Sequence, residues 1–143
     1  MAALKHSRQR ESIRKYLKET TTHPTADTVY ENMKLIYPNI SLGTVYRNLS
    51  LLAELGEIRK LTNYGGADRY DGHIYPHSHF ICTECGKIMD LKVEINDALL
   101  KEVGDNFSGQ IIGCSARFFG LCEDCMKKCK NTKKMLDMSE NMC

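Results

Sequence analysis

Apolar residues recur at helical spacing in three stretches near the start of the sequence. In the first stretch, Ile13, Tyr16 and Leu17 form one stripe of a helix that Ser7 caps and that ends near Thr20. The second stretch begins after a cap at Thr25, and its apolar positions follow the spacing i, i+3, i+4 and i+7: Ala26, Val29, Tyr30 and Met33. The pattern therefore predicts two amphipathic helices.

A third helix is expected after a cap at Ser41, with a stop at Gly56. Its predicted buried positions are Leu42, Val45, Leu49 and Leu52. Residues 58–61 and 68–70 have the pattern of short strands joined around Gly65-Gly66, which is a hairpin signal. Three helices followed by a two-stranded ribbon predict a winged helix-turn-helix. A small helical domain with a solvated polar face fits the same periodicity.

In a winged helix-turn-helix, the third helix lies in the DNA major groove. The outward face of this helix carries Gly43, Thr44, Tyr46, Arg47 and Ser50, and the wing carries Arg59, Lys60 and Arg69. Hydroxyl groups bind phosphates or bases, and arginine and lysine bind phosphates or guanine. The candidate DNA contacts are Ser41, Thr44, Tyr46, Arg47, Arg59 and Lys60.

The second half has a different pattern, with short strands expected at 80–82, 87–92, 110–113 and 116–121. A short amphipathic helix is expected from Asn96 to Val103, with Gly104 as its stop. The tail from Met126 is rich in lysine and is expected to form a fraying helix. The fold class that follows is α+β.

Composition supports a division into two domains. The 143 residues are 42% apolar and 27% charged, which is an ordinary globular balance. Residues 1–72 hold eleven Lys and Arg against eight Asp and Glu, a net +3, whereas 73–143 hold nine against ten and all seven cysteines. We expect domains at 1–72 and 77–143, joined by a hinge at 73–76. No stretch is long and apolar enough to span a bilayer and the start lacks an apolar leader, so we expect a cytoplasmic protein without membrane partners.

The strongest chemical signal is Cys82-x-x-Cys85 followed by Cys122-x-x-Cys125. Each pair places two thiolates on one turn, and four thiolates complete the tetrahedral shell that zinc prefers. A dithiol redox centre is the competing interpretation, but it expects one pair at the start of a helix in a βαβ unit. We interpret the remaining cysteines otherwise: Cys114 as a buried residue, and Cys129 and Cys143 as spare thiols.

A second candidate site is His77-x-His79 with Asp90. Residues i and i+2 of a strand point to the same face, and the strand that carries Asp90 folds back beside them after the zinc turn. Two imidazoles and a carboxylate suit Fe²⁺, Mn²⁺ or Zn²⁺. Two surface histidines and a solvated aspartate explain the same residues.

These motifs, with Ser41-x-x-Thr44-Val45-Tyr46-Arg47-Asn48-Leu49 upstream, resemble the ferric uptake regulator (Fur) family over nearly the whole chain. The resemblance implies a homodimeric, metal-activated transcriptional repressor of operator DNA rather than an enzyme. It also implies an N-terminal winged helix, a C-terminal α/β dimerisation domain, one structural Zn²⁺ per subunit and one regulatory Fe²⁺ or Mn²⁺ per subunit.

Within the family, the sequence is most similar to the peroxide-regulator branch. There the regulatory ion is held by three histidines and two aspartates, and the matching positions are His23, Asp71, His77, His79 and Asp90. Iron-responsive relatives typically have glutamate at the positions of Asp71 and Asp90. The resemblance thus implies that hydrogen peroxide is the signal, that iron-catalysed oxidation of His23 or His77 releases the DNA, and that oxidative-stress genes are then derepressed.

Three departures from the family pattern and three alternatives remain. The chain starts close to its first helix, without the helix that usually precedes it in the family. Cys114 stands near a common histidine and Ser78 replaces a common acidic residue, and because of these two changes we expect no additional metal site. The alternatives are an iron- or zinc-uptake repressor that senses the metal itself, a small metalloenzyme or thiol oxidoreductase, and a structural zinc protein without a regulatory ion. An enzyme would need an open coordination position, a substrate pocket and a general base.

Overall fold

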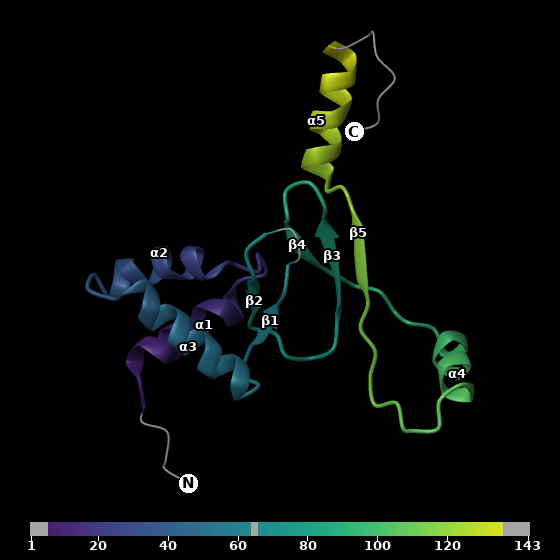
Figure 1. Cartoon of the computed structure of the whole chain (residues 1–143), viewed down its shortest axis with the longest axis horizontal. Helices are drawn as coiled ribbons and strands as arrows, with labels where there is room; N and C mark the ends of the chain where they lie inside the picture. Colours follow the sequence, from purple (N-terminus) through teal and green to yellow (C-terminus); the bar gives the residue numbers. More distant parts are fainter. Residues whose placement is uncertain (1–5, 64–65, 136–143) are drawn as a thin grey trace. The chain divides into compact units, whose positions relative to one another are not determined.

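The computed structural model describes residues 6–63 and 66–135. The chain divides between Pro76 and His77 into two compact units. The first unit contains α1 (Arg8–Glu19), α2 (Ala26–Ile36), α3 (Leu42–Glu54), β1 (Arg59–Leu61) and β2 (Arg69–Asp71). The second contains β3 (Ser78–Cys82), β4 (Ile88–Leu91), α4 (Asp97–Asp105), β5 (Arg117–Gly120) and α5 (Glu123–Met135) (Figure 1). The chain therefore has mixed helices and sheets.

The three helices of the first unit begin where the sequence predicts. At each N-terminus, the side-chain oxygen of the capping residue accepts a hydrogen bond from the backbone N–H three residues later, at Ser7, Thr25 and Ser41. Such a cap satisfies one of the backbone donors that the first turn leaves unpaired. The predicted caps and helix positions are confirmed.

The apolar stripes of these helices meet in one core. Its buried side chains include Ile13, Leu17, Val29, Met33, Val45, Leu49 and Leu52. Leu42, which was also expected to be buried, is only half-buried at the first position of α3. Strand β1 pairs antiparallel with β2, whose Tyr70 is buried in the same core. The expected hairpin at Gly66 is confirmed, and Gly65 lies outside the described residues.

A three-stranded sheet in the order β4-β3-β5 forms the second unit. Strand β3 is antiparallel to β4 and parallel to β5. The strand expected at 110–113 is wrong: that segment has no regular structure, and Ile111 and Ile112 are exposed. A strand requires a neighbour with which to pair, and β4 and β5 already occupy both edges of β3 in the described chain.

Two helices complete the second unit. Helix α4 begins at Asp97, one residue after the predicted start, with Asn96 as its N-cap, and it continues past Gly104 to Asp105. Glycine ends a helix when it adopts a positive φ, and inside a helix it only costs about 1 kcal/mol. Helix α5 starts at Glu123, before the predicted Met126, with acidic residues in its first turn. No helix in the described part of the chain is long and apolar enough to cross a membrane.

Candidate metal centres

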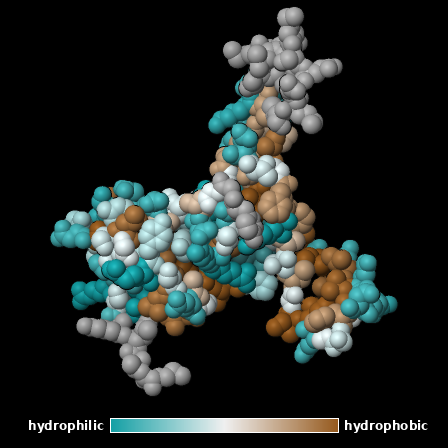
Figure 2. All heavy atoms as spheres, in the orientation of Figure 1, coloured by the Kyte–Doolittle hydropathy of each residue, from teal (hydrophilic) through white to brown (hydrophobic). Residues whose placement is uncertain are grey.

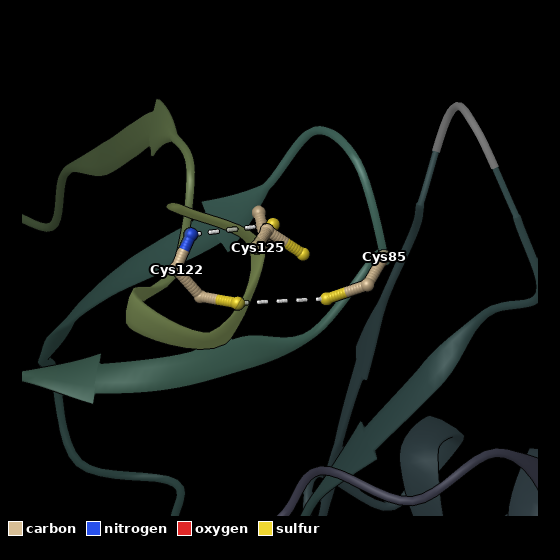
Figure 3. Close-up of side chains that lie close together, drawn as sticks. Cys85, Cys122 and Cys125 are labelled. Atoms are coloured by element: carbon tan, nitrogen blue, oxygen red, sulfur yellow. Dashed lines mark hydrogen bonds between the residues drawn. The ribbon is translucent and has the colours of Figure 1, made fainter. Parts of the chain in front are cut away.

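Four cysteines from distant parts of the sequence converge at one end of the three-stranded sheet. Cys82 ends β3, Cys85 lies in the turn that follows, Cys122 follows β5, and Cys125 lies in the first turn of α5. Their four sulfur atoms lie within 4.8 Å of one another. Figure 3 shows the sulfur atoms of Cys85 and Cys122 pointing toward each other, 3.8 Å apart. The convergence expected from the sequence is therefore present.

The parallel pairing of β3 with β5 explains this convergence. Parallel strands end at the same edge of a sheet, and Cys82 lies opposite Gly120 in the register. The backbone N–H of Thr83 also donates to the carbonyl of Gly120 at 2.8 Å. Gly86 closes the first cysteine turn with a φ of 72°, which glycine adopts without strain. The sheet thus brings the two Cys-x-x-Cys turns together.

The thiols interact strongly with one another and with the backbone. Burial raises the pKa of the Cys82 thiol, but hydrogen bonds from the backbone N–H groups of Cys85, Cys122 and Glu84 outweigh burial and lower it to about 6. Hydrogen bonding to the Cys122 side chain raises the pKa of Cys125 to about 12. Four neighbouring thiolates repel one another, and a divalent cation removes that repulsion. The group fits a structural zinc ion.

Two of the other three cysteines differ from the expectation. Cys114 is exposed, not buried, because it lies in the irregular segment between α4 and β5. Cys129 is disulfide-bonded, so it is not a spare thiol. Cys143 lies outside the described residues. None of these corrections affects the four-cysteine group.

A second group of ligand atoms gathers in the second unit, on β3, on β4 and at His77 directly before β3. The rings of His77 and His79 lie on one side of the strand, with centroids 4.4 Å apart. His79 stands opposite Asp90 in the ladder. One oxygen of Asp90, Oδ1, is 3.0 Å from Nε2 of His77 and 3.4 Å from Nε2 of His79. This half-site has the geometry that the His-x-His spacing predicts.

The first unit holds a pair of ligand-type residues, His23 and Asp71. Nε2 of His23 is 3.6 Å from Oδ2 of Asp71, and each side chain is about 1% exposed. Buried charged or polar side chains require partners because desolvation is costly. An imidazole and a carboxylate are donors that suit Fe²⁺, Mn²⁺ or Zn²⁺. The pair therefore fits a transition-metal half-site.

The backbone around His23 is held in an uncommon conformation. Its φ is 50°, a left-handed value that few residues other than glycine adopt. A guanidinium N–H of Arg69 donates to the His23 carbonyl at 3.3 Å, and the N–H of Tyr70 donates to the Pro24 carbonyl at 3.0 Å. Strand β2 thus fixes the loop that carries His23, and the same strand ends at Asp71. Such strain is typical of functional sites.

The candidate DNA-contacting residues lie at the start of α3 and on the β1–β2 hairpin. Ser41 and Thr44 are joined at the helix N-terminus by a 2.9 Å hydrogen bond, and Arg47 donates to the Thr44 hydroxyl at 3.0 Å. Tyr46 is 45% exposed. This helix face is polar and accessible.

The hairpin cations have partners within the first unit. Lys60 lies 3.0 Å from a carboxylate oxygen of Asp68. Arg59 donates to the carbonyl of Ile74 at 2.7 Å, in the connector after β2. This second contact could not be predicted from the sequence, because nothing in the local pattern around Arg59 points to a residue in the connector.

Comparison with known proteins identifies the family. The profile of the "Ferric uptake regulator family" matches residues 1–113. The chain belongs to the ferric uptake regulator family. Members of this family are metal-responsive transcriptional regulators, so the expected class of function is confirmed at that level.

Individual relatives extend the match. The chain is 31% identical over 127 residues to the peroxide-responsive repressor PerR of Staphylococcus aureus, covering 89% of this chain and 86% of that protein. It superimposes on the ferric uptake regulator Fur of Helicobacter pylori with a TM-score of 0.75 and 26% identity, over 96% of this chain and 85% of the other. The Campylobacter jejuni peroxide stress regulator has a TM-score of 0.67 and 34% identity, with 82% and 88% covered.

Proposed function

We propose that this protein is a metal-dependent repressor that releases operator DNA when hydrogen peroxide oxidises a histidine ligand of its regulatory ion. The observation that carries the proposal is the ligand set. Both carboxylates are aspartates, Asp71 and Asp90, as the resemblance to the peroxide branch implies, and iron-responsive relatives typically have glutamates there. The identities to the S. aureus repressor and the C. jejuni regulator support this branch.

The proposed ligands of the regulatory ion come from both units. His23 and Asp71 belong to the first, and His77, His79 and Asp90 to the second. A cation that needs all five favours the arrangement in which the two half-sites meet. To shift the equilibrium between the two arrangements from mostly open to mostly closed, the ion must bind the closed arrangement more tightly by about 5.5 kcal/mol. This amount is within the binding free energy of a transition-metal site. We propose that this arrangement presents both recognition helices of a dimer to successive major grooves.

The first unit is proposed to be a winged helix that binds DNA. Its exposed α3 face and its hairpin supply hydroxyl, phenol and cationic groups, which are the groups that contact phosphates and base edges. The proposed contacts are those of the sequence analysis: Ser41, Thr44, Tyr46, Arg47, Arg59 and Lys60. Arg59 also donates a hydrogen bond to the Ile74 carbonyl, so this residue has a second contact, in the connector after β2.

The second unit is proposed to join two copies of the chain. Helix α4 buries none of its residues, and brown spheres gather over it in Figure 2. Exposed apolar side chains lie on α4, on β5 and between them: Leu99, Leu100, Val103, Phe107, Ile111, Ile112, Phe118 and Phe119. Exposed apolar side chains in such number are typical of an association interface. Family members act as dimers, and a second copy is the proposed partner.

The proposed chemistry assigns one change to the protein itself. Fe²⁺, when bound, would catalyse cleavage of the peroxide O–O bond, and the two electrons that reduce peroxide would come overall from the imidazole ring. The ring of His23 or His77 then gains one oxygen atom, and the other peroxide oxygen leaves as water. The oxidised ring binds the metal ion more weakly, so the two half-sites no longer share an ion. The arrangement that binds DNA is then no longer stabilised. Mn²⁺ is expected to occupy the same ligands without supporting this oxidation.

The test uses the zinc-containing full-length protein loaded anaerobically with Fe²⁺ or Mn²⁺. After peroxide, the iron form should gain the mass of one oxygen atom on a peptide that contains His23 or His77 and should lose operator binding. The mass of the manganese form should not change, and this form should still bind operator DNA. An unchanged mass with intact DNA binding in the iron form rejects peroxide sensing and leaves metal sensing as the function.

A further inference from the structure

The two oxygens of Asp71 have different neighbours. Oδ1 accepts a hydrogen bond from the backbone N–H of His73 at 2.8 Å, and Nδ1 of the His73 ring lies 3.4 Å from the same oxygen. Oδ2 lies 3.6 Å from Nε2 of His23. One side of the carboxylate therefore faces His73, and the other side faces the histidine that is proposed to share the cation.

Close packing holds this short turn in place. A Cβ on Gly72 would lie 2.4 Å from the backbone carbonyl of Leu17, so the turn rests directly on the last part of α1. The His73 side chain is only 26% exposed, and its ring meets the ring of Tyr75 edge-on, with centroids 5.7 Å apart. The imidazole thus has little freedom to leave Asp71.

We propose that His73 is a positioning residue for Asp71, an inference that rests on the proposed role of Asp71 as a ligand. The terminal torsion of an aspartate is soft, so an unsupported carboxylate rotates and offers either oxygen. The His73 backbone N–H fixes Oδ1, and the ring reinforces that contact because a small rotation shortens 3.4 Å to hydrogen-bond length. The carboxylate then offers only Oδ2 to the cation.

This arrangement predicts how ion affinity depends on the His73 side chain. Partners that orient a ligand typically change metal affinity by about 10- to 100-fold when they are removed. The backbone donor stays in every His73 variant, so the side chain can be tested separately. Asparagine carries an amide N–H near the place of Nδ1, whereas leucine has similar bulk and no donor. His73→Asn should therefore rescue what His73→Leu loses.

The experiment measures Mn²⁺ affinity by electron paramagnetic resonance in the full-length, zinc-containing protein. His73→Leu is expected to weaken Mn²⁺ binding about 10- to 100-fold, while His73→Asn stays close to the unsubstituted protein. His6→Leu removes an exposed imidazole and is the matched control. If His73→Leu does not fold, His73→Ala replaces it in the comparison with asparagine.

The outcomes separate this inference from the proposed function. Wild-type affinity in His73→Leu, or equal losses in the leucine and asparagine variants, overturns the positioning role. Asp71→Asn is measured in parallel. If Asp71→Asn weakens Mn²⁺ binding but His73→Leu does not, only the positioning role fails. If Asp71→Asn also leaves the affinity unchanged, Asp71 is not a ligand and the proposed ligand set itself fails.

Discussion

His79 and Asp90 stand opposite each other in the β3–β4 ladder, with Nε2 of the histidine 3.4 Å from Oδ1 of the aspartate. The same oxygen is 3.0 Å from Nε2 of His77. Opposed residues of an antiparallel pair have their Cβ atoms about 4.5–5.5 Å apart. A short carboxylate therefore suffices to meet both imidazoles, and a longer one has to fold back on itself.

Replacing Asp90 by glutamate tests whether carboxylate length sets the response to peroxide. Asp90→Glu extends the side chain by one bond of about 1.5 Å and keeps the charge. We expect metal-dependent operator binding to persist and peroxide-induced histidine oxidation to decrease. Mass spectrometry of the iron form and a parallel DNA-binding assay measure the two effects. Undiminished oxidation in this variant would remove aspartate as the determinant of peroxide sensing.

The four-cysteine group is expected to stabilise the second unit. Cys122→Ser removes one thiolate of the set and should abolish zinc retention and unfold that unit at a lower temperature, because structural zinc supplies folding free energy. Metal analysis and thermal unfolding followed by circular dichroism measure both. Cys114→Ser is the control, since Cys114 is exposed and outside the group. Equal zinc content in the two variants would contradict the assignment.

Zinc binding to the metal-free protein should release protons. The Cys82 pKa of about 6 means that this thiol is already ionised at pH 7.5, whereas the pKa of Cys125 near 12 means that its proton must leave. Affinity should therefore rise as pH rises, by about tenfold per unit for each proton released. Calorimetry in buffers of different ionisation enthalpy counts these protons. A pH-independent affinity between pH 6 and 9 would exclude this account.

Two glycines offer a matched pair for stability. A Cβ at Gly72 meets the Leu17 backbone at 2.4 Å, whereas a Cβ at Gly104 meets nothing within 4 Å. Gly72→Ala should destabilise the first unit by about 1–3 kcal/mol through overpacking. Gly104→Ala, inside α4, should stabilise by about 0.5–1 kcal/mol. Denaturant unfolding gives both values, and a neutral Gly72→Ala would mean that the turn shifts away from α1 without strain.

Association is expected to depend on the apolar surface of the second unit. Phe119 on β5 is 62% exposed, and Phe119→Glu places a charge where a second copy is proposed to pack. Light scattering should then give the mass of one chain. Leu35→Glu is the control, because Leu35 is 83% exposed on α2 of the first unit. A dimer that persists with Phe119→Glu and dissociates with Leu35→Glu would place the interface on the first unit, contrary to the proposal.

Much of the fold could be predicted from local signals. Caps and helical spacing identified α1, α2 and α3, because each signal lies within one or two turns of the residue that it fixes. The prediction of a strand at 110–113 was wrong because strand formation depends on a distant neighbour. The apolar residues of this segment suit a strand, but the local pattern does not reveal whether such a neighbour is present. Gly104 misled because a glycine stops a helix only through its backbone conformation.

The candidate metal sites show the same contrast between short-range patterns and long-range contacts. Cysteine spacing and the His77-x-His79 pair are short-range patterns, so the residues alone indicated them. His23 and Asp71 carry no such pattern, and only the family resemblance identified them. Their proximity results from the pairing of β2 with the loop after α1, including a contact between Arg69 and His23 that spans 46 positions. The role of His73 could not be inferred from the sequence, because it depends on the direction in which Asp71 turns.

Forty positions separate Cys82 from Cys122, although the two meet at the end of the sheet. At about 5–20 residues per second, a ribosome needs about 2–8 s to add that stretch. During this interval Cys82 and Cys85 are already part of the chain, whereas Cys122 and Cys125 are not, and the parallel strand β5 is not yet complete. The four-cysteine group can therefore be completed only after the last of its cysteines has been added to the chain.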